Sequence, residues 1–153
     1  MKNFVIIALV FSANFSFSQQ TADKIEVKNT IDAFFKAFHE QDSVAIKSTV
    51  SDEVIMQSIG KNKDGKIKLT TANFHDFLKS IISIPKENTF EEKLTDYIIN
   101  VDGNMANVWT PYEFWYNGKF SHCGVNNFQL FKEDEHWKII YIIDTRRRDC
   151  AKN

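Results

Sequence analysis

A carboxylate, an imidazole and an amide fall within one aromatic stretch of the chain, WTPYEFWYNGKFSHCGVN, which spans residues 109–126. These groups are Glu113, His122 and Asn126. A carboxylate beside an imidazole holds one tautomer of the ring and raises its pKa, which suits a general acid or base. A few polar groups between aromatic walls are also typical of a ligand-binding pocket. The stretch therefore indicates either acid–base chemistry or recognition of a polar ligand.

The same stretch predicts a β-hairpin that brings these groups together. Asn117-Gly118 is typical of a two-residue hairpin turn. Counting outward from this turn places Glu113 opposite His122 and Trp109 opposite Asn126. Directly opposed side chains share a face of the sheet, with Cβ atoms about 4.5–5.5 Å apart, so Glu113 and His122 could form a hydrogen bond.

The last predicted strand, HWKIIYIIDTRR, would add two more charged groups to this face. A three-residue turn before the strand places Asp144 and Arg146 on the same face as His122. A two-residue turn places Thr145 and Arg147 there instead. We favour the first register, because Asp144 would then line a cavity.

The resulting face has polar groups in its middle and bulky apolar groups around them, and we predict that it lines a pocket. A bulge at Pro111 or Gly124 would slip the register by one residue and separate Glu113 from His122. The alternative is a solvated sheet face that tryptophans merely cover. The candidate catalytic residues are Glu113, His122 and Asp144, and the candidate ligand-binding residues are Trp109, Glu113, His122, Asn126, Asp144 and Arg146.

Three helices are predicted in the first half of the chain, before these strands. Asp23 is expected to cap the first helix and Thr71 the third, and a second, short helix is expected to start at Asp42-Ser43. His39 and His75 lie off the apolar faces and are expected to face solvent. Phe34 and Phe38, together with the third helix, should close the far side of the pocket. The first helix carries an apolar stripe of Val27, Ile31, Phe34, Phe35 and Phe38.

From Phe90 onward the hydrophobic period changes to two, which indicates β-strands. One strand is expected over residues 93–101, followed by a two-residue turn at Asp102-Gly103 that places Asp96 opposite Trp109. Helices that precede a run of antiparallel strands predict an α+β fold, with the helices on one face of a curved sheet.

The N-terminal residues predict a secretory signal peptide over residues 1–18. A single Lys is followed by the apolar run FVIIALVF, and SFS precedes Gln19 as a small-x-small cleavage pattern. The apolar run is shorter than the roughly 20 residues that span a bilayer, although a membrane anchor or a buried strand is the alternative. We therefore expect one domain over residues 19–153, located in the periplasm or secreted, with no membrane attachment after cleavage.

Composition and motifs exclude several classes of function. The 153-residue chain has a formal net charge of −1, which gives no basis for binding nucleic acid or anionic lipid. No Gly-rich phosphate loop and no metal-ligand spacing occurs, so no cofactor and no metal are expected. Cys123 and Cys150 are too few for a closed zinc site. The sequence does not decide whether these two cysteines form a disulfide, because the bond requires the tail after Arg148 to fold back.

The order of elements and three segments resemble a known superfamily. IDAFFKAFHEQD, VWTPYEFWYNGKFSHCGVNNFQLF and WKIIYIIDTRRRD are similar to the nuclear-transport-factor-2-like superfamily, in particular its lumazine-binding and SnoaL-like group. The resemblance implies a cystatin-like α+β cone, in which a strongly bent antiparallel sheet wraps N-terminal helices around a deep pocket. It also implies a homodimer formed through the sheet. The superfamily includes isomerases, dehydratases, hydrolases and proteins without catalysis, so the fold does not identify a reaction.

Three functional hypotheses follow from these observations. The first is a binding protein for a small, flat, polar or aromatic ligand, because the polar groups stand among aromatic walls without a complete catalytic signature. The second is a cofactor-free acid–base enzyme, an isomerase, dehydratase or hydrolase, which the Glu113–His122 pair would support. The third is a non-catalytic module that dimerises through its sheet.

Overall fold

The computed structural model describes the backbone of residues 2–150 and the side chains of residues 19–150. The predicted signal peptide, residues 1–18, lies outside the residues whose side chains are described, so it stays a prediction. Within the described part of the chain, no helix combines the length and the apolar character that a membrane span needs.

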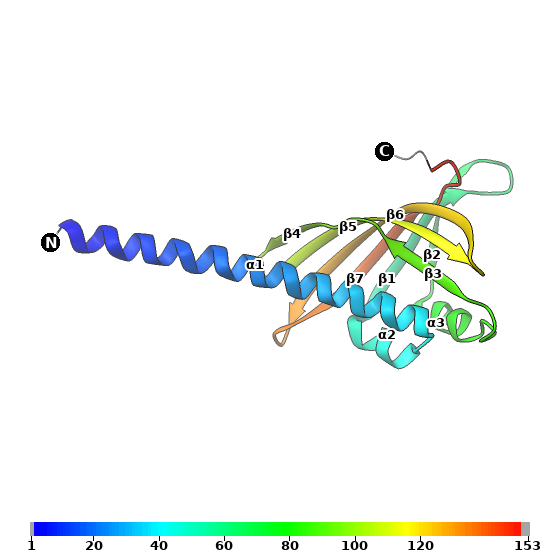
Figure 1. Cartoon of the computed structure of the whole chain (residues 1–153), viewed down its shortest axis with the longest axis horizontal. Coiled ribbons are helices and arrows are strands. Elements are labelled where there is room, and N and C mark those ends of the chain that lie inside the picture. The colour runs from blue at the N-terminus through cyan, green and yellow to red at the C-terminus, as the bar shows by residue number, and fades with distance from the viewer. Residues whose placement is uncertain (1, 151–153) are drawn as a thin grey trace.

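The chain forms an α+β fold, as the sequence predicts, in which helices pack on one seven-stranded sheet (Figure 1). The strands are ordered β2-β1-β7-β6-β5-β3, and β4 also pairs with β5. The elements are α1 (Lys2–Glu40), α2 (Ser43–Thr49), β1 (Val50–Lys61), β2 (Ile67–Ala72), α3 (Phe74–Ile82), β3 (Phe90–Leu94), β4 (Ile98–Asp102), β5 (Met105–Tyr116), β6 (Lys119–Glu133) and β7 (His136–Thr145).

The sheet is mixed, because β1 runs parallel to β7 while all its other strand pairs are antiparallel. The predicted antiparallel arrangement is confirmed for the C-terminal strands. We call the face of the sheet that packs against α1 the inner face and the opposite one the outer face.

The apolar stripe of α1 forms the centre of the core, as predicted. Phe34, Phe35 and Phe38 are almost completely buried, and the first two contact Phe128 on the inner face of β6 at ring-centroid distances of 6.2 and 6.0 Å. Edge-to-face packing of this kind favours a well-ordered aromatic core.

The helix starts agree with the sequence only in part. The second helix, α2, begins at Ser43 as predicted, and Asp42 caps it, because its Oδ1 accepts hydrogen bonds from the Val44 and Ala45 amides. Asp23 is not a cap: it lies inside α1, where its buried carboxylate bonds Lys132 Nζ at 2.8 Å. Thr71 belongs to β2, a strand that the sequence analysis missed. The cap of α3 is Asn73.

The strand expected over residues 93–101 is broken into two. β3 and β4 both pair with β5, and residues 95–97 lie between them. The turn after β4 is shifted along the chain, since Asp102 pairs with Met105. Ile98, rather than Asp96, therefore lies opposite Trp109.

The hairpin between β5 and β6 begins as predicted and then slips by one residue. Asn117-Gly118 forms the two-residue turn, with φ values of 48° and 70° that favour Asn and Gly. Trp115 pairs with Phe120, but Phe114 pairs with His122, so Ser121 is an extra residue in β6. The bulge lies closer to the turn than the positions considered from the sequence.

The last strand reaches its register through two departures from the expected pattern. A two-residue turn pairs Glu133 with His136, whereas the sequence analysis favoured a three-residue turn. Ile140 is then an extra residue in β7, because the strand partners change between Leu130–Ile139 and Gln129–Tyr141. The two shifts together place Asp144 opposite Asn126, on the inner face.

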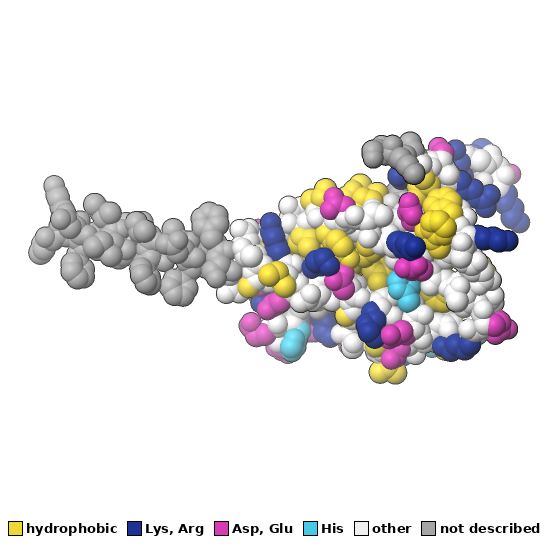
Figure 2. Space-filling model, viewed as in Figure 1, with side chains coloured by type: hydrophobic (Ala, Val, Ile, Leu, Met, Phe, Trp, Pro, Cys, Tyr) yellow, Lys and Arg dark blue, Asp and Glu magenta, His cyan; other side chains and the backbone are white. Residues whose placement is uncertain are grey.

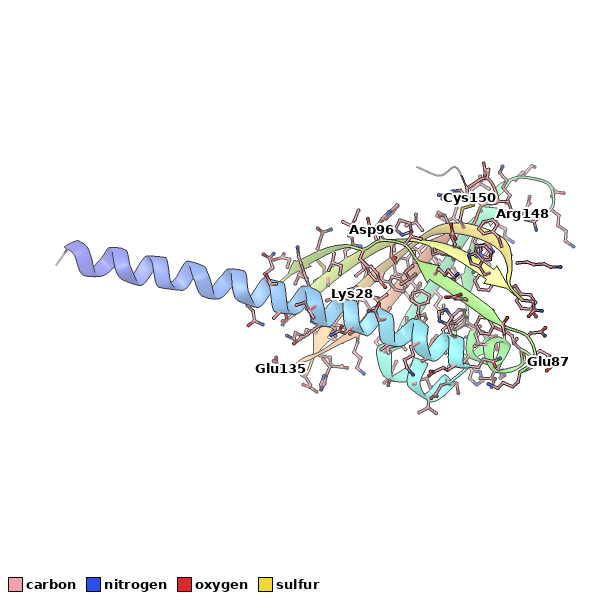
Figure 3. The ribbon with its side chains drawn as sticks, in the orientation of Figure 1. Lys28, Glu87, Asp96, Glu135, Arg148 and Cys150 are labelled. Carbon is pink, nitrogen blue, oxygen red and sulfur yellow. A yellow bond between two sulfur atoms is a disulfide. The ribbon has the colours of Figure 1, made fainter. Side chains whose placement is uncertain are left out.

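Cys123 and Cys150 form a disulfide, the possibility left open by the sequence (Figure 3). Cys123 pairs with Arg147, because backbone hydrogen bonds of 3.0 and 2.9 Å continue the strand pairing past the end of β7. The tail then brings the two Cα atoms to 6.1 Å, within the usual range for a disulfide.

We expect loss of this disulfide to lower the free energy of unfolding by about 3 kcal/mol, because it closes a loop across a sequence separation of 27. Denaturant unfolding of wild-type protein with and without reductant measures the effect. Cys150→Ser should reproduce the reduced value and be insensitive to reductant. Equal stability of oxidised wild-type protein and Cys150→Ser would contradict a stabilising disulfide.

Candidate functional site

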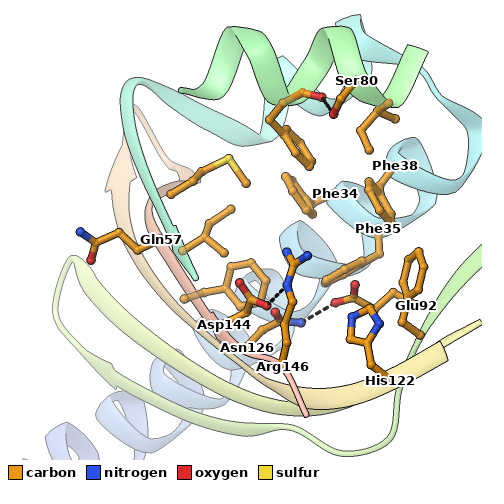
Figure 4. A pocket seen from close by; sticks show the side chains of 16 residues that line it. Phe34, Phe35, Phe38, Gln57, Ser80, Glu92, His122, Asn126, Asp144 and Arg146 are labelled. Carbon is orange, nitrogen blue, oxygen red and sulfur yellow. Dashed lines mark hydrogen bonds and ion pairs between the residues drawn. The ribbon is translucent and has the colours of Figure 1, made fainter. Parts of the chain in front are cut away.

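A cavity of about 310 Å³ lies between α1, α3 and the inner face of the sheet (Figure 4). Its volume falls at the small end of the range for ligand pockets, about 300–1,000 Å³. The apolar walls are formed by Phe34, Phe35, Phe38, Met56, Phe77, Ile81, Phe114, Phe128 and Ile142. The polar lining consists of Gln57, Ser80, Glu92, His122, Asn126, Asp144 and Arg146.

Most of the candidate residues from the sequence meet at this cavity. His122, Asn126, Asp144 and Arg146 line it. Phe34, Phe38 and α3 close it, as expected. Their role in ligand binding stays a prediction.

Trp109 and Glu113 do not reach the cavity, so their predicted convergence with the other residues is wrong. Ser121 shifts the pairing of β5 with β6, and Glu113 therefore lies opposite Cys123 on the outer face. There its Oε2 accepts a hydrogen bond from Trp115 Nε1 at 3.1 Å. Trp109 is 44% exposed on the same face. No Glu113–His122 pair can form, because the two side chains point to opposite sides of the sheet.

Glu92 occupies the position in the cavity that was expected for Glu113. It lies on β3 between Phe90 and Leu94, and it is paired with Phe114 of β5 on the inner face. Its Oε1 accepts a hydrogen bond from Asn126 Nδ2 at 2.7 Å. The sequence did contain a signal, because FEEKL alternates and places Glu92 on the same side as two apolar residues.

Burial raises the pKa of the Glu92 carboxyl group from 4.5 to about 7. The hydrogen bond from Asn126 and the positive charge of Arg146 oppose this rise, whereas the negative charge of Asp144 adds to it. The carboxyl group therefore changes protonation state near neutral pH, as a general acid or base must.

Asp144 and Arg146 form the second polar pair of the cavity. Asp144 Oδ2 lies 2.7 Å from Arg146 Nε and accepts a further hydrogen bond from the Tyr112 hydroxyl at 3.3 Å. The single Tyr112 hydroxyl proton is shared between this oxygen and the Thr145 carbonyl oxygen at 3.0 Å, and burial raises the pKa of Tyr112 above its ordinary value. Asp144 is thus held from two sides and in turn orients the arginine.

Gly124 makes this arrangement possible. A Cβ atom at this position would overlap the Thr145 carbonyl oxygen and lie 2.7 Å from Tyr112 Cε1. Because Gly124 is directly opposite Tyr112, the tyrosine ring can cross the sheet over the glycine and reach Asp144.

The two histidines near the cavity depart from expectation. Burial, followed by the positive charge of Arg146, lowers the pKa of His122, whereas a Glu113 partner would have raised it. The His122 ring stacks on Phe114 with centroids 5.0 Å apart. His39 does not simply face solvent: its Nε2 accepts a hydrogen bond from the Glu92 amide at 2.9 Å, and burial lowers its pKa.

No group of three metal-ligating side chains occurs in the part of the chain that the structure describes. The expected absence of a metal and of a cofactor stays a prediction.

Comparison with solved structures identifies the fold. A cystatin-like protein of unknown function from Nostoc punctiforme is 11% identical, with a TM-score of 0.65, and the match covers 85% of this chain and 95% of that one. A candidate dehydratase of the NTF2-like family from Streptomyces avermitilis is 16% identical, with a TM-score of 0.63 and coverages of 83% and 97%. The chain has the NTF2-like, cystatin-like fold.

Similarity within this fold extends to a protein described as a candidate aromatic ring hydroxylase from Novosphingobium aromaticivorans. It is 12% identical, with a TM-score of 0.61, and the match covers 82% of this chain and 90% of that one. No protein-family model and no curated protein matches the sequence. At these identities the likeness establishes the NTF2-like fold alone, so the function must be argued from the residues of the site.

The shifted pKa of Glu92 predicts how stability depends on pH. Below about pH 4.5 the carboxyl group is protonated in both the folded and the unfolded protein. As the pH rises to about 7, the unfolded state loses this proton first, so stability falls by up to about 3 kcal/mol and then stays level. We expect Glu92→Gln to remove this decline in unfolding experiments from pH 4 to 8.

Glu91→Gln is the matched control, because Glu91 is 56% exposed and its Oε2 lies 3.5 Å from Lys93 Nζ. This variant should keep the wild-type pH profile. A profile that Glu92→Gln leaves unchanged would contradict a near-neutral pKa for Glu92.

Proposed function

We propose that this protein binds a small, flat and largely apolar molecule whose polar group contacts Glu92, Asn126, Asp144 and Arg146. The observation that carries the proposal is the clustering of these polar side chains on one side of a cavity walled by phenyl rings. Apolar walls supply burial, while a few placed polar groups fix the orientation of a ligand.

The energetic cost of the polar groups supports a ligand-binding role. Carboxyl and guanidinium groups are expensive to bury without partners. Here Glu92 bonds Asn126 and Asp144 bonds Arg146, so each of these groups has a partner within the protein. Each pair leaves atoms that are not committed to other described residues, including Glu92 Oε2 and the terminal nitrogens of Arg146.

A periplasmic or secreted location is part of the proposal. The expected signal peptide over residues 1–18 is one basis for it. The Cys123–Cys150 disulfide is another, because disulfides persist in oxidising compartments.

The outer face of the sheet is the surface proposed for a homodimer. Apolar side chains are exposed over β4 and β5 and at the β5–β6 hairpin (Figure 2). They include Ile98, Trp109 and Phe120, which are 54%, 44% and 40% exposed. Apolar patches of this kind are common at contacts between subunits.

A thermal-shift screen of flat aromatic compounds tests the binding function. A ligand at 100 times its Kd stabilises the folded state by about 2.7 kcal/mol, which raises Tm by about 5–10 °C in a protein of this size. We expect Ser80→Trp to abolish the shift, because Ser80 lines the cavity from the exposed side of α3.

Ser83→Trp is the matched control, since Ser83 is exposed at the end of α3 and does not line the cavity. It should keep the full shift. A hit that both tryptophan variants retain would place the ligand elsewhere, and a screen without hits would count against a small-molecule function.

A cofactor-free acid–base enzyme is the second candidate function. The pKa of Glu92, about 7, favours it, because a carboxyl group poised near the working pH can remove a proton beside a carbonyl group and return it. The fold is shared with a candidate dehydratase, which is compatible with this chemistry.

Deuterium exchange at the α-carbon of a flat ketone such as 1-indanone, followed by proton NMR in D₂O, tests this second candidate. We expect the protein to accelerate exchange and Glu92→Gln to reduce that acceleration by about 10²–10⁴-fold. Glu91→Gln should have no effect. Equal acceleration by both variants would exclude Glu92 as the base.

A further inference from the structure

Arg146 shows which class of ligand the cavity accepts. Building on the proposed binding function, we propose that the ligand is an aromatic monocarboxylate whose carboxylate group binds end-on to the two terminal nitrogens of Arg146, with its ring among the phenyl groups.

The orientation of Arg146 is the first observation behind this proposal. Asp144 Oδ2 binds Arg146 Nε at 2.7 Å, and the Arg146 amide donates to the Ile59 carbonyl at 3.0 Å, which fixes the start of the side chain. Figure 4 shows the guanidinium group directed into the cavity toward Phe34. Its terminal Nη1 and Nη2 have no acceptor among the side chains of residues 19–150.

The free edge of this guanidinium group matches a carboxylate. An arginine offers paired N–H donors along two edges, and each edge fits the two oxygens of a carboxylate. Asp144 occupies the nitrogen Nε and thereby removes one edge. The remaining edge, formed by Nη1 and Nη2, faces the cavity and can donate hydrogen bonds to a planar anion.

The exposure of the lining residues gives the cavity a mouth and a floor. The Arg146 side chain is 59% exposed, whereas Phe34, Phe35 and Phe128 are no more than 7% exposed. A molecule with its carboxylate at Arg146 would therefore keep the charged group near water and bury its ring among the phenyl groups. This orientation satisfies both ends of an aromatic acid.

A cationic ligand is the competing possibility, because Glu92 Oε2 has no partner among the described side chains. Arg146 argues against it: the fixed positive charge at the mouth would repel a cation. Arg146 also offers two uncommitted terminal nitrogens, and a protonated Glu92 adds a hydroxyl donor. Donors of this kind require a ligand rich in acceptors.

Binding of an anion should be coupled to protonation of Glu92. The charged and titratable groups around Glu92 are Asp144 on β7, Arg146 just after it, Tyr112 on β5 and His122 on β6, while His39 of α1 contacts its amide. A carboxylate at Arg146 adds a negative charge near Glu92 and favours its neutral form. Affinity for the anion should therefore be highest below pH 7 and fall as the pH rises.

Isothermal titration calorimetry with three probes that share a naphthalene ring and differ in charge tests the proposal. 2-Naphthoate carries a carboxylate, 2-naphthamide is its neutral analogue, and 2-naphthylmethylamine is a cation. At pH 6 we expect 2-naphthoate to bind at least tenfold more tightly than either of the others. Its affinity should fall several-fold by pH 8 in wild-type protein and change little in Glu92→Gln.

Arg146→Gln should lower the affinity for 2-naphthoate at least tenfold and the affinity for 2-naphthamide less than threefold. Arg147→Gln is the matched control and should change neither, because Arg147 is exposed and lies outside the cavity. Arg146→Lys keeps the positive charge but lacks the paired donors, so it should also lower the affinity for 2-naphthoate. It serves as the test if Arg146→Gln does not fold.

The carboxylate proposal would be overturned if the amide or the amine bound more tightly than 2-naphthoate. It would also be overturned if Arg147→Gln lost as much affinity for 2-naphthoate as Arg146→Gln. Either result would leave the binding function in place. Failure of all three probes to bind would overturn both.

Discussion

Ser121 is an extra residue in β6, and the side chains that enter the cavity depend on it. On the turn side of this bulge, Trp115 meets Phe120 on the outer face. Beyond it, the residues of β6 face the opposite side from the one that continuous pairing would give, so His122 and Asn126 join Tyr112 and Phe114 on the inner face. Bulges near functional sites commonly redirect side chains in this way.

The polar groups selected by this register are tolerable in an apolar cavity because they are paired. Glu92 bonds Asn126, which lies opposite Asp144, and Asp144 bonds Arg146 and Tyr112. Burial keeps Glu92 partly protonated near neutral pH, which reduces the negative charge that the site must hold. The same pairing leaves Glu92 Oε2 and one edge of the Arg146 guanidinium group uncommitted, and the proposed ligand would use that edge.

The sequence predicted the architecture well, because periodicity and turn residues are local signals. The α1 stripe, the start of α2 at Asp42-Ser43 and the Asn117-Gly118 turn all follow from residue types within a few positions of one another. Strand register is not local: one extra residue changes every later pairing, and nothing in the residue types marks Ser121 as that residue. Glu113 was therefore assigned to the wrong face.

Asp144 and Arg146 were placed on the correct face for an incorrect reason. The turn before β7 is shorter than expected, and the extra residue Ile140 compensates for the difference. Glu92 was missed although FEEKL alternates, because the strand was expected to begin at Lys93. Helix starts failed where tertiary contacts dominate, as at Asp23, whose carboxylate pairs with Lys132 instead of capping a helix.

The central claim is that Glu92 is a half-buried carboxyl group with a near-neutral pKa at the polar end of an aromatic cavity. Carbon-13 NMR of protein labelled at the glutamate side-chain carboxyl carbon measures it directly, with Glu92→Gln to assign the resonance. We expect this carbon to titrate with a midpoint of about 7. A Glu92 midpoint near 4.5 would contradict it.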